Sequence, residues 1–432
     1  MNHSNKNSYD VAVIGGGAAG LVAAITASRS GAKTIVIEHM DRVGKKILST
    51  GNGKCNYTNA LQGIAYYRGE NPAFVLPVFE QFGLEDTLRF FSELGIYPKE
   101  KRGYYYPASE QAASVLDVLR MELSYRDVSL QTSFELTGIE KQSKSGREPQ
   151  FELTGHSAED EKNRQKIYAK TILFATGLLA APKTGSDGSA FSLIRKFNHH
   201  FIDVVPALVP LQGKQTFFKA LAGIRTEMEL RLYIEKECAA VEQGELQLTD
   251  YGISGIPVFQ VSRFATRALS KKQAVSAEID FLPKLTAEEV LSLLKERFLS
   301  FGYGKSTSEA MIGLFPRKLN DVLLKESGVR LDIPAEQLSY RQLSTLCAKI
   351  KAFRVDICGS KPIELGQVCA GGVNTCEIDN ETLESKLVSG IYFAGEVIDI
   401  DGTCGGYNLQ WAWSSGYVAG IHAAAKTKRS RT

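Results

Sequence analysis

A glycine-rich stretch near the N-terminus has the spacing of a phosphate-binding turn. Gly15, Gly17 and Gly20 follow the pattern G-x-G-x-x-G, with Ala18 and Ala19 before the last glycine. In this pattern the first glycine allows a tight turn, the second lets a pyrophosphate approach the backbone, and the third lets helix and strand pack closely. The N-terminus of the following helix supplies N–H groups and partial positive charge for phosphates. The stretch therefore predicts a dinucleotide-binding turn.

An acidic residue completes this fingerprint. Glu38 lies 18 residues after Gly20, at the end of the apolar segment 34–37. A carboxylate at the end of the second strand binds ribose hydroxyls and repels a 2′-phosphate. We therefore expect FAD or NAD rather than NADP as the resident dinucleotide.

A second glycine-rich turn favours FAD over NAD. Residues 401–409 (DGTCGGYNL) lead into a long helical segment, and a strand ending in Gly395 and Glu396 precedes them. The N–H groups at such a helix N-terminus stabilise negative charge on a reduced flavin ring. NAD needs no such second anchor, and the sequence contains no second nicotinamide-binding fingerprint. Because no histidine or cysteine lies in a flavinylation motif, we expect the FAD to be noncovalent.

The predicted cofactor-binding residues lie mostly in these two turns, at the strand ends beside them, or in loop 44–56, whose glycines and lysines suit a dinucleotide. They are Gly15, Gly17, Ala18, Ala19, Gly20, Glu38, Lys45, Lys46, Gly51, Asn52, Gly53, Asn56, Ile139, Thr176, Gly177, Gly395, Glu396, Gly406, Tyr407, Asn408 and Leu409.

Composition and cysteine usage exclude several classes of protein. Apolar residues make up 44% of the chain and charged residues 23%, as in globular proteins, and the net charge is only +3. The seven cysteines include no C-x-x-C pair, which favours free thiols in a reducing cytoplasm and no metal site. Cys55 stands alone where disulfide reductases need two cysteines. The uncharged run 11–28 contains four glycines, so we expect a strand, turn and helix there rather than a membrane span.

The elements around these residues predict an α/β fold. Segments 9–14, 34–37 and 168–175 read as buried parallel strands, and the first two flank a helix that ends near Ser30, as in a doubly wound sheet. Segments 228–234, 274–281 and 353–357 indicate a separate antiparallel β unit. Between 285 and 351 the pattern is helical, with helices opening at Thr286 and at Pro334. We expect a hairpin tip at 143–149 and a frayed, solvated tail at 426–432.

Several motifs together resemble the BaiN-like (YhiN-like) flavoproteins, a family that includes aminoacetone oxidase and a proposed bile-acid enone reductase. They are GGGAAG at 15–20, GNGKCNYTN at 51–59, LFATG at 173–177, PALVPL at 206–211, GISG at 252–255, AGGV at 370–373 and almost all of 384–420. The resemblance implies an FAD-binding, glutathione-reductase-like Rossmann domain at 1–199 and 370–432. It further implies a β-sandwich or barrel-like domain at 200–284 and 352–369, itself interrupted by a helical subdomain at 285–351.

Departures from this family lie on the substrate side. Tyr104 stands where the family commonly has arginine, Asp250 stands where it has histidine, and LLAAP at 178–182 replaces a Gly-x-Ser-x-Pro motif. A tyrosine in the run 104–106 would supply a proton donor or an apolar wall. The candidate catalytic residues are Tyr104, Tyr106, Asp250 and Tyr407.

These observations predict an FAD-dependent oxidoreductase acting on a small or hydrophobic organic substrate. Reduction of a conjugated, bile-acid-like enone, with NADH or NADPH as a transient electron donor, competes with oxidation of an aminoacetone-like amine by oxygen. An RNA-modifying flavoprotein and a redox-silent flavoprotein are more distant alternatives. Because the chain shows no basic stripe, we expect a small-molecule substrate, no nucleic acid and no membrane. Substrate identity and oligomeric state stay open.

Overall fold

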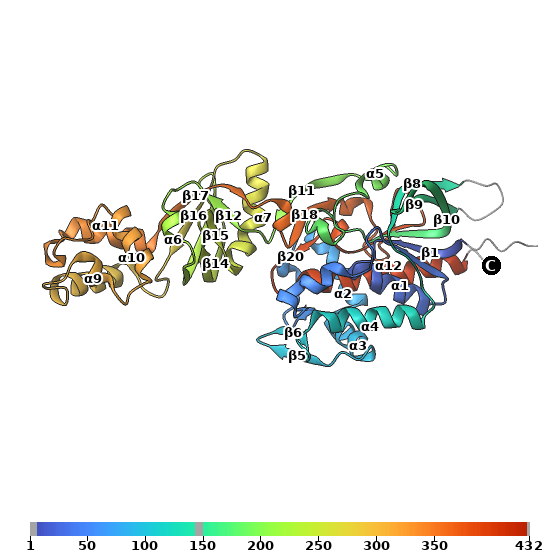
Figure 1. The fold of residues 1–432 in the computed structure, drawn as a ribbon, viewed down its shortest axis with the longest axis horizontal. Coiled ribbons are helices and arrows are strands. Elements are labelled where there is room, and N and C mark those ends of the chain that lie inside the picture. Colours follow the sequence, from blue (N-terminus) through green and yellow to red (C-terminus); the bar gives the residue numbers. More distant parts are fainter. Residues whose placement is uncertain (1–6, 143–149, 430–432) are drawn as a thin grey trace, which may run out of the picture. The chain divides into compact units, whose positions relative to one another are not determined.

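The computed structural model describes residues 7–142 and 150–429. Two compact units make up the chain (Figure 1). The first unit comprises Met1–Val204 and Val368–Thr432, and the second comprises Val205–Gln367. Each unit has its own cluster of buried apolar side chains. The predicted hairpin tip at 143–149 lies outside the described residues.

A parallel sheet forms the centre of the first unit. Its order is β7 (Ser129–Gln131), β2 (Thr34–Ile37), β1 (Ser8–Ile14), β10 (Asp160–Phe174) and β19 (Ile391–Phe393). The first part of β10 also pairs with β9 (Gln150–Ser157), which pairs with β8 (Phe134–Gln142), both antiparallel. The carboxyl ends of β2, β1, β10 and β19 therefore meet at one edge of the sheet, where ligands bind in open α/β folds.

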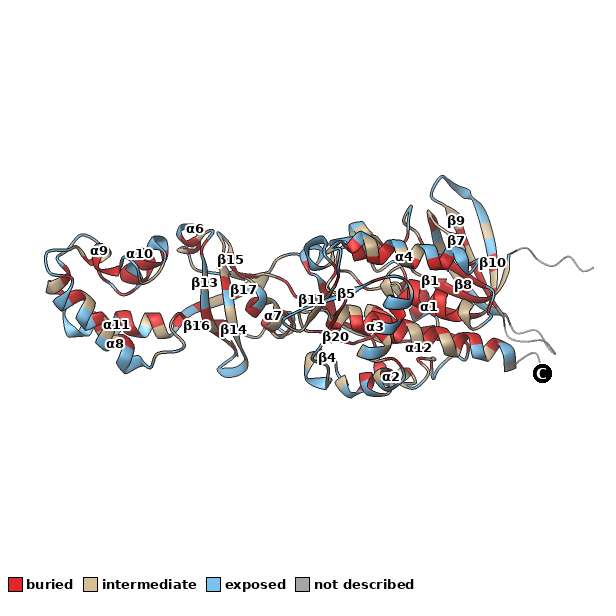
Figure 2. Cartoon of the chain, turned by 90° about the horizontal axis from the view of Figure 1, so that it is seen from below, coloured by how far each residue is buried: buried red, intermediate tan, exposed pale blue. Residues whose placement is uncertain are grey.

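Two helices of small residues pack together beside this sheet. Helix α1 (Ala18–Arg29) is buried from Ala19 to Ala27, and α12 (Tyr407–Arg429) lies against it (Figures 1 and 2). A Cβ at Gly416 would overlap the carbonyl oxygen of Ala19, and one at Gly420 would overlap that of Ala23. Glycine at both positions lets α12 approach α1 closely, with the middle of α12 beside the first turns of α1.

The rest of the first unit surrounds these elements. Its helices are α2 (Leu76–Gln81), α3 (Leu84–Glu93), α4 (Ala112–Tyr125) and α5 (Phe191–Arg195). Small sheets pair β3 (Thr58–Asn59) with β6 (Tyr104–Pro107), β6 with β5 (Pro98–Lys101), and β4 (Tyr67–Arg68) with β20 (Asp401–Gly402). Where the chain passes between the units, β11 (Phe201–Ala207) pairs with β18 (Val368–Val373).

The second unit is a closed antiparallel barrel with helices. The barrel order is β12 (Leu211–Gly213), β15 (Gly252–Ser254), β14 (Glu237–Leu248), β13 (Arg225–Ile234), β16 (Val275–Asp280) and β17 (Phe353–Ser360). Its helices are α6 (Phe218–Leu221), α7 (Ile256–Ser270), α8 (Ala287–Lys295), α9 (Thr307–Met311), α10 (Arg317–Glu326) and α11 (Tyr340–Lys351). The predicted fold class, a doubly wound parallel sheet with an antiparallel β insertion and helices, is confirmed.

Two predicted helix ends are wrong. The helix expected at Pro334 begins at Tyr340, because Ser339 and Gln342 form the capping box, and residues 335–337 make only one 3₁₀ turn. The tail expected to fray from Lys426 continues α12 to Arg429. The helix expected at Thr286 does begin there, with Thr286 accepting from the N–H of Glu289. In the described part of the chain, no helix is long and apolar enough to span a membrane.

Candidate cofactor and substrate site

The phosphate turn (residues 15–20) contains glycines of two kinds. Gly15 has φ +99°, and a Cβ there would lie 2.5 Å from the carbonyl oxygen of Ala175. A Cβ at Gly20 would overlap the carbonyl oxygen of Gly15. Gly17 differs, because its φ is −80° and a Cβ there would meet no heavy atom within 4 Å. The fold therefore requires glycine at 15 and 20, whereas Gly17 faces open space beside the N-terminus of α1.

Glu38 is fixed beside this turn at the end of β2. Its carboxylate accepts the Gly16 N–H at Oε2 and the Met40 N–H at Oε1, each at 2.8 Å. The residue is 8% exposed. Oε1 also lies 3.4 Å from His39 Nδ1. Each carboxylate oxygen has two acceptor sites, so the second site of Oε2 is the one that remains for a ligand hydroxyl. This geometry fits a ribose diol at the position that the fingerprint predicts.

The ends of β10 and β19 adjoin the same turn. A Cβ at Gly395 would lie 2.8 Å from the Cβ of Ala19, and one at Gly177 would lie 3.9 Å from Oε2 of Glu396. Lys46 Nζ lies 2.7 Å from Oε2 of Glu396, so loop 44–56 is tied to this edge of the sheet by an ion pair. Four segments far apart in sequence thus lie close together in the first unit.

An unused acceptor lies at the start of α12. Gly406 has φ +95°, and a Cβ there would lie 2.7 Å from the Thr58 carbonyl oxygen and 3.0 Å from Asn56 Oδ1. Asn56 Oδ1 is buried and makes no hydrogen bond with the described residues. A buried acceptor without a partner costs about 1–3 kcal/mol, so a ligand N–H would stabilise it. The imide N–H of a flavin ring is a donor of the required kind.

Asn408 has a structural bond that the sequence did not predict. Its Oδ1 accepts the Gly402 N–H and its Nδ2 donates to the Gly402 carbonyl oxygen, both at 2.8 Å. The side chain therefore holds β20 against α12. A role of Asn408 in cofactor binding stays a prediction, and its backbone N–H in the first turn of α12 is the donor best placed for it.

The remaining predicted cofactor residues lie in loop 44–56, on β8, near the end of β10 and at the start of α12. Lys45 pairs with Asp41, and Gly51, Asn52 and Gly53 are exposed in the 3₁₀ segment Lys45–Gly53. Ile139 is buried in the core on β8, which leaves only its backbone for a ligand. Three half-buried or buried residues complete the set: Thr176, Tyr407 and Leu409.

Tyrosines gather on the other side of the α12 turn (residues 402–406). A Cβ at Gly405 would lie 2.9 Å from Cε1 of Tyr104. The Tyr66 ring stacks on Tyr407, with centroids 4.5 Å apart and an angle of 8°. Burial raises the pKa of Tyr106, with a further contribution from Tyr104, and burial with Tyr66 raises that of Tyr407 well above its usual value. Both shifts favour the protonated phenols, which are the form that can donate a hydrogen bond.

Asp250 belongs to the second unit. It lies exposed in the turn between β14 and β15. Its place in catalysis stays a prediction from the sequence, whereas Tyr104 and Tyr407 both adjoin the α12 turn.

Two polar networks escaped the sequence analysis because their members are far apart in sequence. His199 Nδ1 lies 3.0 Å from Glu377 Oε2 and Nε2 lies 2.8 Å from Ser385 Oγ, and burial lowers the pKa of this histidine. Ser385 Oγ also accepts the N–H groups of Leu387 and Val388, so the arrangement holds a loop rather than activating a nucleophile. No spacing signal marks these contacts in the sequence.

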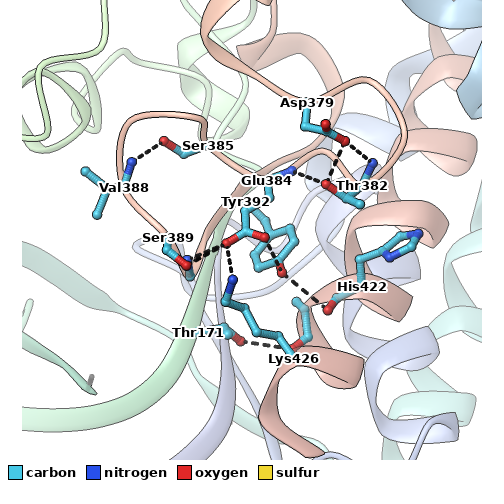
Figure 3. A network of polar contacts seen from close by, with 12 residues as sticks. Thr171, Asp379, Thr382, Glu384, Ser385, Val388, Ser389, Tyr392, His422 and Lys426 are labelled. Carbon is cyan, nitrogen blue, oxygen red and sulfur yellow. Dashed lines mark hydrogen bonds and ion pairs between the residues drawn. The ribbon is translucent and has the colours of Figure 1, made fainter. Parts of the chain in front are cut away.

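The second network anchors the same loop to α12 (Figure 3). Lys426 Nζ contacts Glu384 Oε1, which also accepts the Gly390 N–H at 2.8 Å. The Tyr392 hydroxyl lies 3.3 Å from Glu384 Oε2 and 3.3 Å from the His422 carbonyl oxygen, and its single proton is shared between these two acceptors. Among the described residues no group of histidine, cysteine and carboxylate side chains is arranged to hold a metal ion.

Comparisons with known proteins support this picture. A family model described as the HI0933-like protein Rossmann domain matches residues 9–422. A 3-dehydro-bile acid delta(4,6)-reductase of Clostridium scindens is 40% identical over 418 residues, which cover 96% of this chain and 99% of the relative. A ribosomal RNA dihydrouridine synthase of Haemophilus influenzae is 29% identical over 411 residues, 95% of this chain and 97% of that one.

Two solved structures share the fold. The open conformation of a flavocytochrome c3 fumarate reductase matches with a TM-score of 0.51 and 15% identity, over 98% of this chain and 79% of that one. A 3-ketosteroid-delta4-(5alpha)-dehydrogenase from Rhodococcus jostii matches with a TM-score of 0.50 and 14% identity, over 98% of both chains.

The family model spans nearly the whole chain, and a relative well above 30% identity is covered almost completely. The resemblance drawn from the motifs, to a flavoprotein family with a bile-acid enone reductase among its members, is confirmed. The chain belongs to the HI0933-like family.

Proposed function

We propose that this protein is an FAD-dependent oxidoreductase that reduces a carbon–carbon double bond conjugated to a carbonyl group in a hydrophobic small molecule. One observation supports this most directly: 40% identity, over nearly the full length of both chains, to a bile-acid delta(4,6)-reductase. The open position at Gly17 and the unused acceptor of Asn56 are independent support for the cofactor.

Each part of the site has a role in holding FAD. The phosphate turn takes the pyrophosphate on the side where Gly17 leaves space, and Glu38 takes the ribose hydroxyls. Asn56 and the first turn of α12 take the polar edge of the flavin ring. When bound and reduced by an electron donor, the flavin would supply the hydride that an enone accepts at its β-carbon.

The protein must also supply a proton and polarise the carbonyl. Reduction of an enone places negative charge on the carbonyl oxygen, and a hydrogen-bond donor aimed at that oxygen stabilises it. The α-carbon then takes a proton from a positioned acid. The phenols of Tyr104, Tyr106 and Tyr407 are the donors that the first unit offers beside the α12 turn.

One anaerobic experiment identifies the electron donor and distinguishes a reductase from an amine oxidase. Oxidised holoenzyme is mixed in turn with NADH, with NADPH and with an aminoacetone-like amine while flavin absorption is followed. Bleaching by a nicotinamide supports the reductase. Bleaching by the amine alone, followed by rapid reoxidation with oxygen, supports the alternative of an amine oxidase.

A second candidate substrate comes from the 29% identical relative, whose name denotes dihydrouridine formation in ribosomal RNA. Hydrogen is added there across a double bond conjugated to the uracil carbonyl, so the chemistry is that of enone reduction with a different substrate. We favour the small molecule because the more similar relative acts on one and because the net charge is only +3. Turnover of unmodified ribosomal RNA with no turnover of any enone would reverse this preference.

A further inference from the structure

A short uncharged loop lies beside the α12 turn. Loop 60–66 connects β3 to β4, and the run 57–67 around it (YTNALQGIAYY) contains no charged residue. Two of its apolar side chains face solvent: Leu61 is 61% exposed and Ile64 is 42% exposed. Tyr66 adds a half-buried aromatic ring.

The first end of the loop is fastened to the α12 turn through Asn59. Asn59 Nδ2 donates to the Gly405 carbonyl oxygen at 2.9 Å, and its Oδ1 accepts the Leu61 N–H at 3.0 Å. The Ala60 N–H donates to the Gly103 carbonyl oxygen at 2.7 Å, beside Tyr104. Leu61 is therefore held next to Gly405 and to the tyrosine strand β6.

The second end is fastened to the same turn. The Tyr66 ring stacks on Tyr407, the first residue of α12. The Tyr66 carbonyl oxygen accepts the Thr403 N–H at 2.9 Å. With both ends bound to residues 403–407, Leu61 and Ile64 stay exposed on a loop that lies at the predicted position of the flavin ring.

We propose that loop 60–66 determines substrate specificity by binding the apolar body of a polycyclic enone. Tyr66 stacks on Tyr407, and the loop that carries the exposed Leu61 and Ile64 is bonded through Asn59 to Gly405, which lies beside Tyr104. This inference rests on the proposed function and assigns recognition of the apolar rings of the substrate to this loop.

The lack of charge argues against RNA on this loop. Proteins bind nucleic acid chiefly through lysine and arginine at the phosphates. Arg68, the first cation after the run, directs Nη1 to the carbonyl oxygens of Ala65 and Tyr67. Lys101 and Arg102 in the neighbouring β5–β6 turn are exposed, so they are the residues to test for an RNA substrate.

The test compares two enones in the holoenzyme. The double variant Leu61→Ser, Ile64→Ser is measured beside Leu387→Ser, a 47% exposed leucine of the same unit in the loop before β19. For a steroid enone we expect kcat/KM of the double variant to fall about 10- to 100-fold, because apolar burial of two side chains is lost. For cyclohex-2-enone, which has no extended apolar body, we expect a change within about twofold. Leu387→Ser should change neither value.

Binding gives a second readout. Perturbation of the oxidised flavin spectrum by the steroid enone should show a dissociation constant raised by the same factor, with full FAD occupancy in the variant. An equal loss for both enones, or no loss for either, overturns the inference and leaves the proposed function standing. Wild-type holoenzyme that reduces neither enone contradicts the proposed function itself. The double variant Lys101→Gln, Arg102→Gln tests for an RNA substrate. If it loses turnover of ribosomal RNA while its enone kinetics stay unchanged, and if Leu61→Ser, Ile64→Ser also leaves enone kinetics unchanged, this surface binds RNA and the inference is overturned.

Discussion

The fold does not require glycine at position 17, whereas binding of a dinucleotide does. A Cβ at Gly20 overlaps the Gly15 carbonyl oxygen, whereas one at Gly17 meets no protein atom within 4 Å. Gly17 is also the N-cap of α1, where serine is among the favoured residues. The structure by itself therefore gives no reason for glycine at position 17, and a closely approaching pyrophosphate does.

We predict that Gly17→Ser leaves the unfolding midpoint of the apo protein unchanged or slightly raised, while FAD binding weakens about 10- to 100-fold. The added side chain keeps the pyrophosphate away from the backbone, so one charge-assisted hydrogen bond to a phosphate oxygen is lost. Such a bond contributes about 1.5–3 kcal/mol, which gives the expected factor. Fluorescence titration of the apo protein with FAD measures it. Gly20→Ala serves as the contrasting variant, since it should destabilise the apo protein itself. An FAD affinity equal to wild type in Gly17→Ser would contradict the assigned position of the pyrophosphate.

For single residues, the sequence predicts the positions of the glycines and of Glu38 better than it predicts the side-chain partners of asparagine and histidine. Gly15, Gly20 and Glu38 lie where the fingerprint predicts because their roles depend on local backbone geometry. The clamp of Asn408 on Gly402 and the bond from His199 to Glu377 depend on how distant segments pack. Their partners follow from tertiary structure, which no residue spacing encodes.

The loop before β19 is the element whose stability should depend most clearly on pH. Burial by itself raises the pKa of Glu384, but hydrogen bonds from the Lys426 ammonium and the Gly390 N–H outweigh it and hold the pKa below its usual value of 4.5. A carboxyl group with a lowered pKa in the folded state contributes stability that is fully present above the unfolded value. That contribution is lost as the pH falls below 4.5 and through the folded value.

We predict that Glu384→Gln lowers stability at neutral pH and makes it less dependent on pH below 4.5 than in wild type. Urea unfolding of the apo protein across this pH range measures both effects. Glu80→Gln, an exposed carboxylate of the same unit, is the matched control. A wild-type pH dependence in Glu384→Gln would show that the contact with Lys426 in Figure 3 does not stabilise the folded state.

Helices and strands with strong local signals were predicted closely. The strand expected at 34–37 is β2, because four consecutive β-branched residues favour a strand. The helix expected at Thr286 begins there, because Thr286 and Glu289 form a capping box. The helix expected at Pro334 begins later because proline and Glu336 imitate a helix start. Ser339 and Gln342, which form the real capping box, were present in the sequence as a competing signal.

For residues 426–429, the described part of the expected tail, the prediction was wrong for a different reason. Its basic residues suggest a solvated end, but the Lys426 ammonium finds its partner, Glu384, in a distant loop. Only the folded structure shows that partner.

At the scale of the whole molecule, the chain has two cores, and the predicted cofactor residues all belong to the first unit. Only the family resemblance predicted that one unit interrupts the other. Periodicity within a single segment does not show which distant segments share a core. The first unit begins and ends the chain, so its core forms only when Val368 and the residues after it join the N-terminal part.

We predict that FAD raises the melting temperature of one calorimetric transition and leaves another unchanged. At an FAD concentration of 100 times Kd, binding stabilises the folded state by about 2.7 kcal/mol, which corresponds to roughly 5–10 °C for a unit of this size. At the same FAD concentration the 10- to 100-fold weaker affinity of Gly17→Ser leaves only about 0.4–1.4 kcal/mol of stabilisation, so the shift should fall to about half or less and thereby assign the transition to the first unit. An equal shift of all transitions would show that the units unfold as one.

In the proposed function, FAD bound in the first unit delivers reducing equivalents to a conjugated enone. The most direct test reduces the holoenzyme anaerobically with dithionite, removes the excess reductant, and mixes the enzyme with a steroid enone while flavin absorption is recorded. We predict that the flavin is reoxidised, with one enone converted to a product two mass units heavier for each flavin, as transfer of one hydride and one proton requires. A flavin that stays reduced with every conjugated enone offered, and is reoxidised only when oxygen is admitted, would contradict the account.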